Sequence, residues 1–308
     1  KLVTIYDRIH EIRMRFEVLK RDAGVEYWER LCHGGDKAIL KKELLDRLNE
    51  LDEEFAFIAS CNKGEEYLDP AKIDRIRSIA SRTWIRTLDD RIGISEEELL
   101  RKQCIPKQEL PVTEHVLSDK EEHLFARAEH DHIAADNPWG FRLNEPEFLY
   151  NKGEVYNLGI NRGTLNREER HKINDHIVQT IIMLSALPFP KHLRSVPEVA
   201  GGHHEKMDGT GYPKQLTGSE MSPFARMMAI ADIFEALTAS DRPYKKGESL
   251  SSALSIMTQM TKDHHIDPDL FRLFLTSGIY RTYAEQYLDP SQIDNVDISH
   301  YLSDTSAS

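Results

Sequence analysis

The chain has 308 residues, enough for a main domain with an appended segment, and 52 acidic against 40 basic residues give it a formal net charge of -12. This charge argues against duplex nucleic acid and anionic membrane surfaces as general partners, although a local basic pocket can still bind a small anion. The three cysteines, Cys32, Cys61 and Cys104, are far apart and lack a CxxC spacing, which predicts free thiols in a reducing compartment.

The chain starts at Lys1 rather than at a methionine, so we expect a piece of a longer protein, with room for a sensor or membrane segment upstream. No apolar run in the sequence approaches the length of a membrane-spanning helix. We therefore expect a cytoplasmic protein, or the cytoplasmic part of a larger sensor protein.

Apolar residues recur with heptad spacing in two segments that are separated by Gly34 and Gly35. They are Ile5, Ile9, Ile12, Phe16 and Leu19 in the first segment, and Leu44, Leu48, Leu51, Phe55 and Ile58 in the second. This spacing predicts two long amphipathic helices. The helices either pack on each other as a hairpin or form a signalling helix that makes a homodimer, and the sequence favours neither arrangement.

The middle of the chain changes character at residue 104. Residues 68–103 continue the helical spacing, with Asp69 and Pro70 as a start signal. Periodicity then fades and Pro, Asn, Gly and His accumulate, so we expect a long loop with short strands at 141–143 and 155–158. The predicted division is an N-terminal helical region at 1–103, an irregular linker or insertion at 104–153, and a second domain at 154–308.

Helical periodicity returns in the last part of the chain. Predicted helices span 166–184, where Asn166 to Glu169 resemble a capping box, and then 196–204, 225–238, 250–260, 268–276 and 284–288. No run alternates with period two over enough length to support an extended sheet. The predicted fold class is all-α, a helical bundle preceded by long amphipathic helices.

Three histidines and one aspartate are predicted to share a metal site. His176 shares a helical face with apolar residues and is expected to point inward, and the adjacent His203 and His204 end a predicted helix near its buried edge. Asp232 lies in an otherwise apolar helix, where an unpaired buried carboxylate costs several kcal/mol, on the order of 3–5. A lone inward histidine is more often a core residue, but these four together favour a site for Fe, Mn, Zn or Ni.

A glycine-rich loop follows the two histidines. Gly209 and Gly211 flank a small residue between Asp208 and the Tyr212–Pro213 dipeptide, which predicts a tight loop with backbone N–H groups close to whatever the histidines bind. The structural alternative is a helix-ending turn in which Asp208 caps the local backbone, and this role is compatible with function.

A basic cluster lies past the predicted Asp232 helix. Arg242 and Lys245 supply a guanidinium and an ammonium group suited to a phosphate. A solvated helix end is the alternative interpretation of the cluster.

Taken together, these segments resemble the HD-GYP family of bacterial cyclic-di-GMP phosphodiesterases over roughly residues 154–280. The residues that carry the resemblance are His203, His204, Glu205, Asp208, Gly209, Gly211, Tyr212 and Pro213, then Ala229 to Asp232, and then Asp241 to Tyr244. The resemblance implies a helical HD-type fold, a centre of two or three metal ions, and hydrolysis of a cyclic dinucleotide.

The resemblance also implies roles for individual residues. His176, His203, His204 and Asp232 match metal ligands of the family, and Asp232, Arg242 and Lys245 are the expected catalytic groups. The expected substrate-binding residues are Asp208, Gly209, Gly211, Tyr212, Pro213, Arg242 and Lys245.

One part of the family pattern is missing. Where the family carries its His-Asp pair, this chain has Tyr156 and Asn157, and the lysine that follows the pair is replaced as well. The loss of a bridging carboxylate argues against a normal dinuclear centre, because Asn157 offers only a neutral carbonyl oxygen. The helix that normally precedes the pair is also hard to find. His130, Asp131 and His132 are candidate substitute ligands, although we favour a solvated loop there.

Three functional hypotheses follow. In the first, the metal activates water for attack on the phosphorus of a cyclic dinucleotide, and Arg242 and Lys245 stabilise the developing charge. In the second, the domain is an inactive receptor or protein-interaction module, and replacing Tyr156 and Asn157 by His and Asp partly restores turnover. The third, an HD-type phosphohydrolase acting on a nucleoside monophosphate, is disfavoured by the glycine-rich loop.

Overall fold

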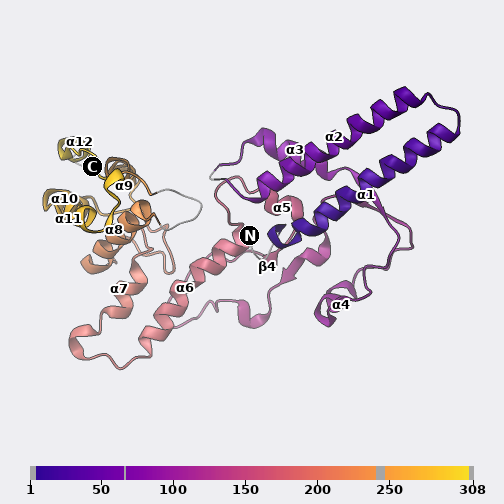
Figure 1. The fold of residues 1–308 in the computed structure, drawn as a ribbon. Coiled ribbons are helices and arrows are strands. Elements are labelled where there is room, and N and C mark those ends of the chain that lie inside the picture. Colours follow the sequence, from indigo (N-terminus) through magenta and orange to yellow (C-terminus); the bar gives the residue numbers. More distant parts are fainter. Residues whose placement is uncertain (1–4, 66, 241–246, 305–308) are drawn as a thin grey trace. The chain divides into compact units, whose positions relative to one another are not determined.

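The structure is a computed structural model that describes residues 5–65, 67–240 and 247–304 (Figure 1). The chain forms two compact units, with residues 1–131 and 146–170 in unit 1 and residues 132–145 and 171–308 in unit 2. Helices predominate in the described residues, and the strands form two small two-stranded sheets, so the all-α prediction is confirmed. The predicted three-part division stays a prediction.

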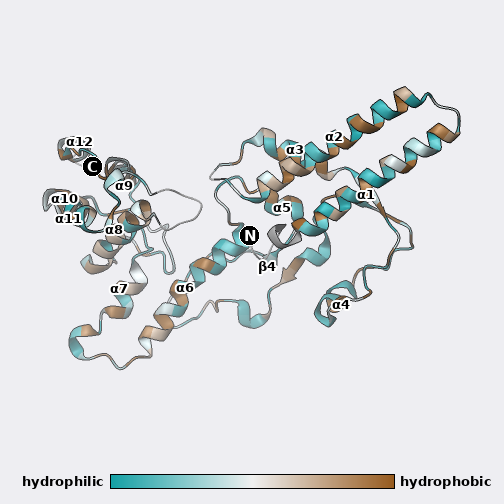
Figure 2. Cartoon of the chain, in the orientation of Figure 1, coloured by the Kyte–Doolittle hydropathy of each residue, from teal (hydrophilic) through white to brown (hydrophobic). Residues whose placement is uncertain are grey.

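Unit 1 begins with a helical hairpin made of α1 (Ile5–Cys32) and α2 (Lys37–Asn62). Phe16 and Leu19 of α1 are buried in one core with Leu51 and Ile58 of α2, as the heptad spacing requires. The rings of Phe16 and Phe55 meet edge to face at 5.6 Å. Figure 2 shows hydrophobic and hydrophilic residues alternating along both helices. The helices therefore pack on each other within the chain.

The remainder of unit 1 mixes short helices with short strands. In order these are α3 (Pro70–Ala80), β1 (Thr83–Arg86), α4 (Glu96–Lys102), β2 (Val112–His115), β3 (Leu124–Ala126), β4 (Phe148–Asn151) and α5 (Glu154–Leu158), with 3-10 turns at Glu121–His123 and Glu129–Asp131. The strands pair antiparallel, β1 with β2 and β3 with β4. Asp69 caps α3 as predicted, but the helical pattern expected to reach residue 103 is interrupted by β1.

The prediction of two short strands, at 141–143 and 155–158, is wrong. Residues 141–143 have no regular secondary structure, and residues 155–158 belong to α5. The reason for the helix is a remote cap, because the carboxylate of Asp119 accepts hydrogen bonds from the N–H groups of Val155 and Tyr156 at 2.9 and 3.1 Å. A cap supplied from 36 positions earlier leaves no local signal in the sequence.

Helix α6 (Arg167–Ser185) starts at a capping box. The side chain of Asn166 accepts from the N–H of Glu169 at 2.7 Å, and the Glu169 carboxylate accepts from the N–H of Asn166 at 3.1 Å. Unit 2 continues with α7 (Val196–Gly202), α8 (Pro223–Thr238), α9 (Leu250–Lys262), α10 (Pro268–Thr276), α11 (Ile279–Tyr287) and α12 (Ile298–Asp304), and with 3-10 turns at Lys191–Leu193 and Pro290–Gln292. The predicted helices of this region correspond to α6 through α11.

Unit 2 has two hydrophobic clusters. The larger one gathers apolar residues of α8, α9, α10 and α11, with Leu254, Met257 and Phe271 fully buried at its centre. The smaller one joins Ile177 and Ile181 of α6 to Phe141 of the segment 132–145. Among the described residues, no helix combines the length and the apolar character that crossing a membrane requires.

Candidate functional site

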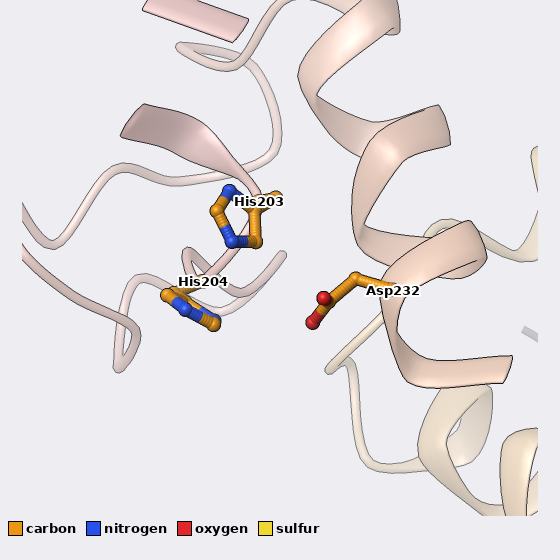
Figure 3. A group of neighbouring side chains, drawn as sticks. All are labelled: His203, His204 and Asp232. Atoms are coloured by element: carbon orange, nitrogen blue, oxygen red, sulfur yellow. The ribbon is translucent and has the colours of Figure 1, made fainter. Parts of the chain in front are cut away.

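His203, His204 and Asp232 are brought together in unit 2. The two histidines follow the last residue of α7, and Asp232 projects from α8 toward them (Figure 3). Gly202 allows the two helices to approach closely, since a Cβ at this position would lie 2.8 Å from the Cβ of Ala225. One ligand atom from each of the three side chains lies within 4.8 Å of the others.

This set of donors fits a divalent transition metal. Two imidazoles and a carboxylate are the ligands that Fe, Mn and Zn take in proteins. Ligand atoms bound to one ion at about 2.1 Å are at most roughly 4.2 Å apart, so only small side-chain rotations separate the present spacing from coordination. All three side chains are half-buried, which limits the competition from bulk water while leaving access for a ligand.

His176 lies beside the same group, but not as the sequence predicted. It is exposed, and the expectation of an inward position is wrong because the buried stripe of α6 consists of Ile177, Val178 and Ile181. Its ring centroid nevertheless lies 5.3 Å from that of His204, in an edge-to-face arrangement. His176 therefore borders the three clustered residues from the solvent side of α6.

The protonation states of the histidines suit metal binding. Nδ1 of His203 lies 2.7 Å from the carbonyl oxygen of Ala200. A carbonyl can only accept, so this nitrogen is the donor, and Nε2 is the ring nitrogen left for a metal. Burial lowers the pKa of His204 to about 4, and the neighbouring His203 acts in the same direction. His204 is therefore neutral near pH 7, the form that binds metals.

The glycine-rich loop, residues 208–213, contacts His204. Tyr212 stacks on His204 with ring centroids 4.8 Å apart, and its N–H donates to the His204 carbonyl at 3.2 Å. Asp208 accepts from the N–H and the hydroxyl of Thr210, both at 2.8 Å, so it caps the local backbone as the structural alternative proposed. Gly209 has a φ of +79, which favours glycine. The loop thus places Tyr212, among the predicted substrate-binding residues, beside the candidate ligands.

Two features of this region were not singled out from the sequence. Glu205, although part of the recognised motif, was given no role, and it proves to be 1% exposed with its carboxylate directed at backbone N–H groups. The second is a strap, residues 132–145, whose Arg142 N–H donates to the Pro213 carbonyl at 2.7 Å. The available signal for the strap was its apolar residues, above all the aromatic pair Trp139 and Phe141.

Among the described residues, the cluster of His203, His204 and Asp232 includes neither His130 nor His132. The side chain of His130 is 85% exposed and lies 3.8 Å from the neighbouring Asp131 carboxylate, while Nδ1 of His132 lies 2.8 Å from the Glu145 carboxylate. These positions suit the solvated loop favoured from the sequence. Arg242 and Lys245 lie within residues 241–246, outside the described residues, so their roles stay predictions.

Asn157, which replaces the family's aspartate, is a buried structural residue of unit 1. Its side chain is 0% exposed, and its amide nitrogen donates to the carbonyls of Asn151 at 2.9 Å and Gly153 at 2.6 Å. Its amide oxygen accepts from the side chain of Asn166 at 2.7 Å. The oxygen considered as a neutral metal ligand is therefore already engaged by a protein donor.

Tyr156, which replaces the family's histidine, is held in a similar way. Its hydroxyl donates to the carboxylate of Glu168 at 2.9 Å. Burial, together with the nearby Glu168 carboxylate, raises the pKa of Tyr156 to about 12. The polar side-chain atoms of both replaced residues are thus engaged in hydrogen bonds within unit 1.

Comparison with known proteins points to one family. A model of the HD domain family matches residues 111–270. A cyclic di-GMP phosphodiesterase of Pseudomonas aeruginosa is 41% identical over 99 residues, which are 32% of this chain and 23% of the relative. A 3'3'-cGAMP-specific phosphodiesterase of Vibrio cholerae is 39% identical over 141 residues, 44% of this chain and 29% of the relative.

A further relative extends the similarity to half of the chain. A cyclic di-GMP phosphodiesterase of Vibrio cholerae is 30% identical over 176 residues, 52% of this chain and 35% of the relative. The chain therefore spans between 23% and 35% of the length of these three relatives.

Proposed function

The chain belongs to the HD domain family, and from this premise we propose that it is a metal-dependent phosphodiesterase that hydrolyses a cyclic dinucleotide. The predicted resemblance to HD-GYP proteins is confirmed by the family match and the similar phosphodiesterases. The observation that carries the proposal is the gathering of His203, His204 and Asp232 within reach of one ion. The names of the relatives support a cyclic dinucleotide as the substrate class.

The proposed cofactor is Fe, Mn or a similar divalent metal, held by His203, His204 and Asp232 with His176 as a further ligand. When bound, it supplies a Lewis acid beside the phosphodiester. The chain's own contribution is to present the neutral imidazole of His204 and to orient His203 through the Ala200 carbonyl. This contact fixes which ring nitrogen of His203 is left for the metal.

The proposed substrate-binding residues lie in the glycine-rich loop and beyond it. Tyr212 presents an aromatic ring next to the candidate ligands, which supports a role for Asp208, Gly209, Gly211, Tyr212 and Pro213 in binding. Arg242 and Lys245 are proposed to contact phosphate, and with Asp232 they are the proposed catalytic residues.

A second candidate function is an inactive receptor or protein-interaction module. It is supported by the environment of Asn157, whose donors and acceptor are all used inside unit 1. In this case, cyclic dinucleotides bind without hydrolysis, and other signalling proteins are the proposed partners.

Metal analysis combined with a hydrolysis assay tests both candidates. Protein purified without oxygen and supplied with Mn²⁺ or Fe²⁺ should retain metal and convert cyclic di-GMP to linear product. His203→Ala and Asp232→Ala should lose the metal, whereas His192→Ala, at an exposed histidine of the same unit, should keep it. Bound nucleotide without product would select the receptor, and wild-type protein without metal would contradict the phosphodiesterase.

We further propose a cytoplasmic homodimer formed through the N-terminal helices. The support is the set of large apolar side chains that the hairpin leaves exposed, among them Val25 at 55%, Trp28 at 63% and Ile39 at 59%. Light scattering of the whole chain should give the dimer mass, and Trp28→Glu should shift it toward the monomer. A monomer mass for the wild type at all concentrations would contradict the dimer.

A further inference from the structure

Glu205 stands next to His204 and would by position be an obvious additional metal ligand. Its carboxylate points elsewhere. One oxygen accepts from the N–H of Lys214 at 2.6 Å and the other from the N–H of Leu216 at 2.9 Å. Because both oxygens are engaged by backbone donors, the carboxylate is held away from metal coordination.

The partners of this carboxylate form a backbone nest directly after the glycine-rich loop. The N–H groups of Lys214 and Leu216, on either side of Gln215, both bond to Glu205. Gln215 has a φ of 58, and a left-handed residue at this point lets successive N–H groups converge on one anion. Such nests commonly bind external anions, and here the anion is part of the chain.

The backbone of Glu205 and Lys206 also packs closely against Gly211 of the glycine-rich loop. A Cβ added at Gly211 would collide with the backbone of Glu205 and Lys206, so only glycine fits. The next residue, Tyr212, donates its N–H to the carbonyl of His204 and stacks its ring on that imidazole. The position of Tyr212 over His204 therefore depends on how closely residues 211–216 fold back onto Glu205.

The two ends of the loop have their own anchors. The N–H of Asp208 donates to the His264 carbonyl at 3.1 Å, and the Pro213 carbonyl accepts from Arg142 at 2.7 Å. Directly after the second end, the Glu205 side chain holds the backbone that follows Pro213. It is 1% exposed, so water does not compete for these bonds.

We infer that Glu205 is a positioning residue, whose carboxylate binds the nest at 214–216 and thereby keeps Tyr212 stacked on the metal-binding imidazole of His204. It touches neither metal nor substrate. Its effect on the metal site rests on the proposed function, but its effect on the loop does not.

Hydrogen exchange and cobalt binding test the inference on the whole chain. Glu205→Gln keeps the size of the side chain but turns an amide NH₂ toward the nest. The peptide covering 206–218 should exchange at least about tenfold faster, the effect of losing one charge-assisted hydrogen bond, while α9 exchanges as in the wild type. The matched control is Glu220→Gln, which changes an exposed carboxylate bonded to the N–H of Thr217 in the same region.

Co²⁺ added alone to metal-free protein reports on the geometry of the site. Glu205→Gln should weaken Co²⁺ binding several-fold and shift its visible spectrum, and Glu220→Gln should do neither. Gly211→Ala should produce the same spectral shift, because it pushes the loop off the Glu205 backbone without changing the carboxylate. If Glu205→Gln fails to fold, Gly211→Ala decides the question, and a wild-type spectrum in that variant overturns the inference.

The remaining outcomes are equally decisive. Unchanged exchange at 206–218 overturns the inference, as does faster exchange spread equally over α9, which would mean a role in general stability. Faster local exchange with unchanged Co²⁺ binding would limit Glu205 to loop stability and reject the positioning role. A wild type that binds no Co²⁺ contradicts the proposed metal site, while the exchange result still decides whether Glu205 holds the loop.

Discussion

Asn157 illustrates how the surroundings of one side chain decide what its replacement does. Its amide nitrogen faces two carbonyl oxygens, and its amide oxygen faces the amide of Asn166. An aspartate at this position would place a buried carboxylate against those carbonyls. The earlier expectation that Tyr156→His with Asn157→Asp partly restores turnover is therefore replaced by one of lost stability.

We expect Asn157→Asp to lower the free energy of unfolding by at least about 2 kcal/mol, since two buried acceptors lose their donor. Denaturant unfolding at neutral pH measures the change. Asn49→Asp, on the exposed surface of α2, is the matched control and should alter stability by less than about 0.5 kcal/mol. Unchanged stability of Asn157→Asp, or turnover gained by the double variant, would contradict the structural role.

Tyr156 makes stability depend on alkaline pH. Its folded-state pKa is raised from 10.0 to about 12, so the phenol ionises more readily in the unfolded chain. Its contribution is fully present below pH 10 and is lost as the pH rises toward 12. Between pH 9 and pH 11, Tyr156→Phe should show a shallower loss of stability than the wild type. Tyr287→Phe, at a side chain 65% exposed, should keep the wild-type slope, and equal slopes in all three proteins would disprove the assignment.

The clustered residues show what the sequence could predict at this scale. His203, His204 and Asp232 were recognised from residue type and motif, and the structure brings them together. The partners of Glu205 lie 9 and 11 positions away and follow from the fold of the loop, which the sequence pattern does not describe. A motif can thus mark a residue without giving its role.

At the scale of elements, α5, which contains Tyr156 and Asn157, is bonded to the N-terminal hairpin. Glu154 is 0% exposed at the start of α5, and Arg15 of α1 donates to both of its carboxylate oxygens at 3.0 and 2.9 Å. The same guanidinium donates to the carbonyl of Val116 at 2.9 Å. This ion pair, with a fully buried carboxylate and a partly buried guanidinium, links α1 to α5.

Arg15→Met should reduce the free energy of unfolding by about 3 kcal/mol, because it leaves a buried carboxylate without its cation. Urea unfolding provides the measurement, and Arg21→Met, an exposed arginine of the same helix, is the control. Adding Glu154→Leu to Arg15→Met should recover part of the loss, since the charge is then removed as well. A loss below about 1 kcal/mol in the single variant would mean that the pair is dispensable.

Helices were predicted well, and short strands were not. The heptad residues Phe16, Leu51 and Ile58 are buried as expected, because α1 and α2 are long enough to repeat their pattern several times. Strands of three or four residues give too few repeats to detect. The face of α6 was misjudged because Ile173 is 51% exposed and the buried stripe begins at Ile177.

For the whole molecule, net charge governs which nucleic acids can bind. With a formal charge of -12, the chain should repel duplex DNA, so no anisotropy change is expected with labelled duplex at about 10 µM protein and physiological salt. Cyclic di-GMP should bind under the same conditions, because a small ligand needs only a local site. Duplex binding that weakens steeply with added salt would contradict this prediction.

The division of the chain into two units depends on contacts that sequence patterns do not report. The segment 132–145 lies within the predicted linker, yet it packs into unit 2. Its ends are joined because the Glu145 carboxylate accepts from the N–H of Ile133 at 2.6 Å. A segment without regular secondary structure can therefore still pack its side chains into a hydrophobic cluster.

The polar network around Asn157 has a consequence for the evolution of the chain. The carbonyls of Asn151 and Gly153 accept hydrogen bonds from the Asn157 amide nitrogen, and an aspartate has no donor with which to replace them. A return to the family's His-Asp pair would pass through intermediates of lower stability unless these partners changed together. We therefore expect that the chain can regain the family's His-Asp pair only after compensating substitutions elsewhere in unit 1.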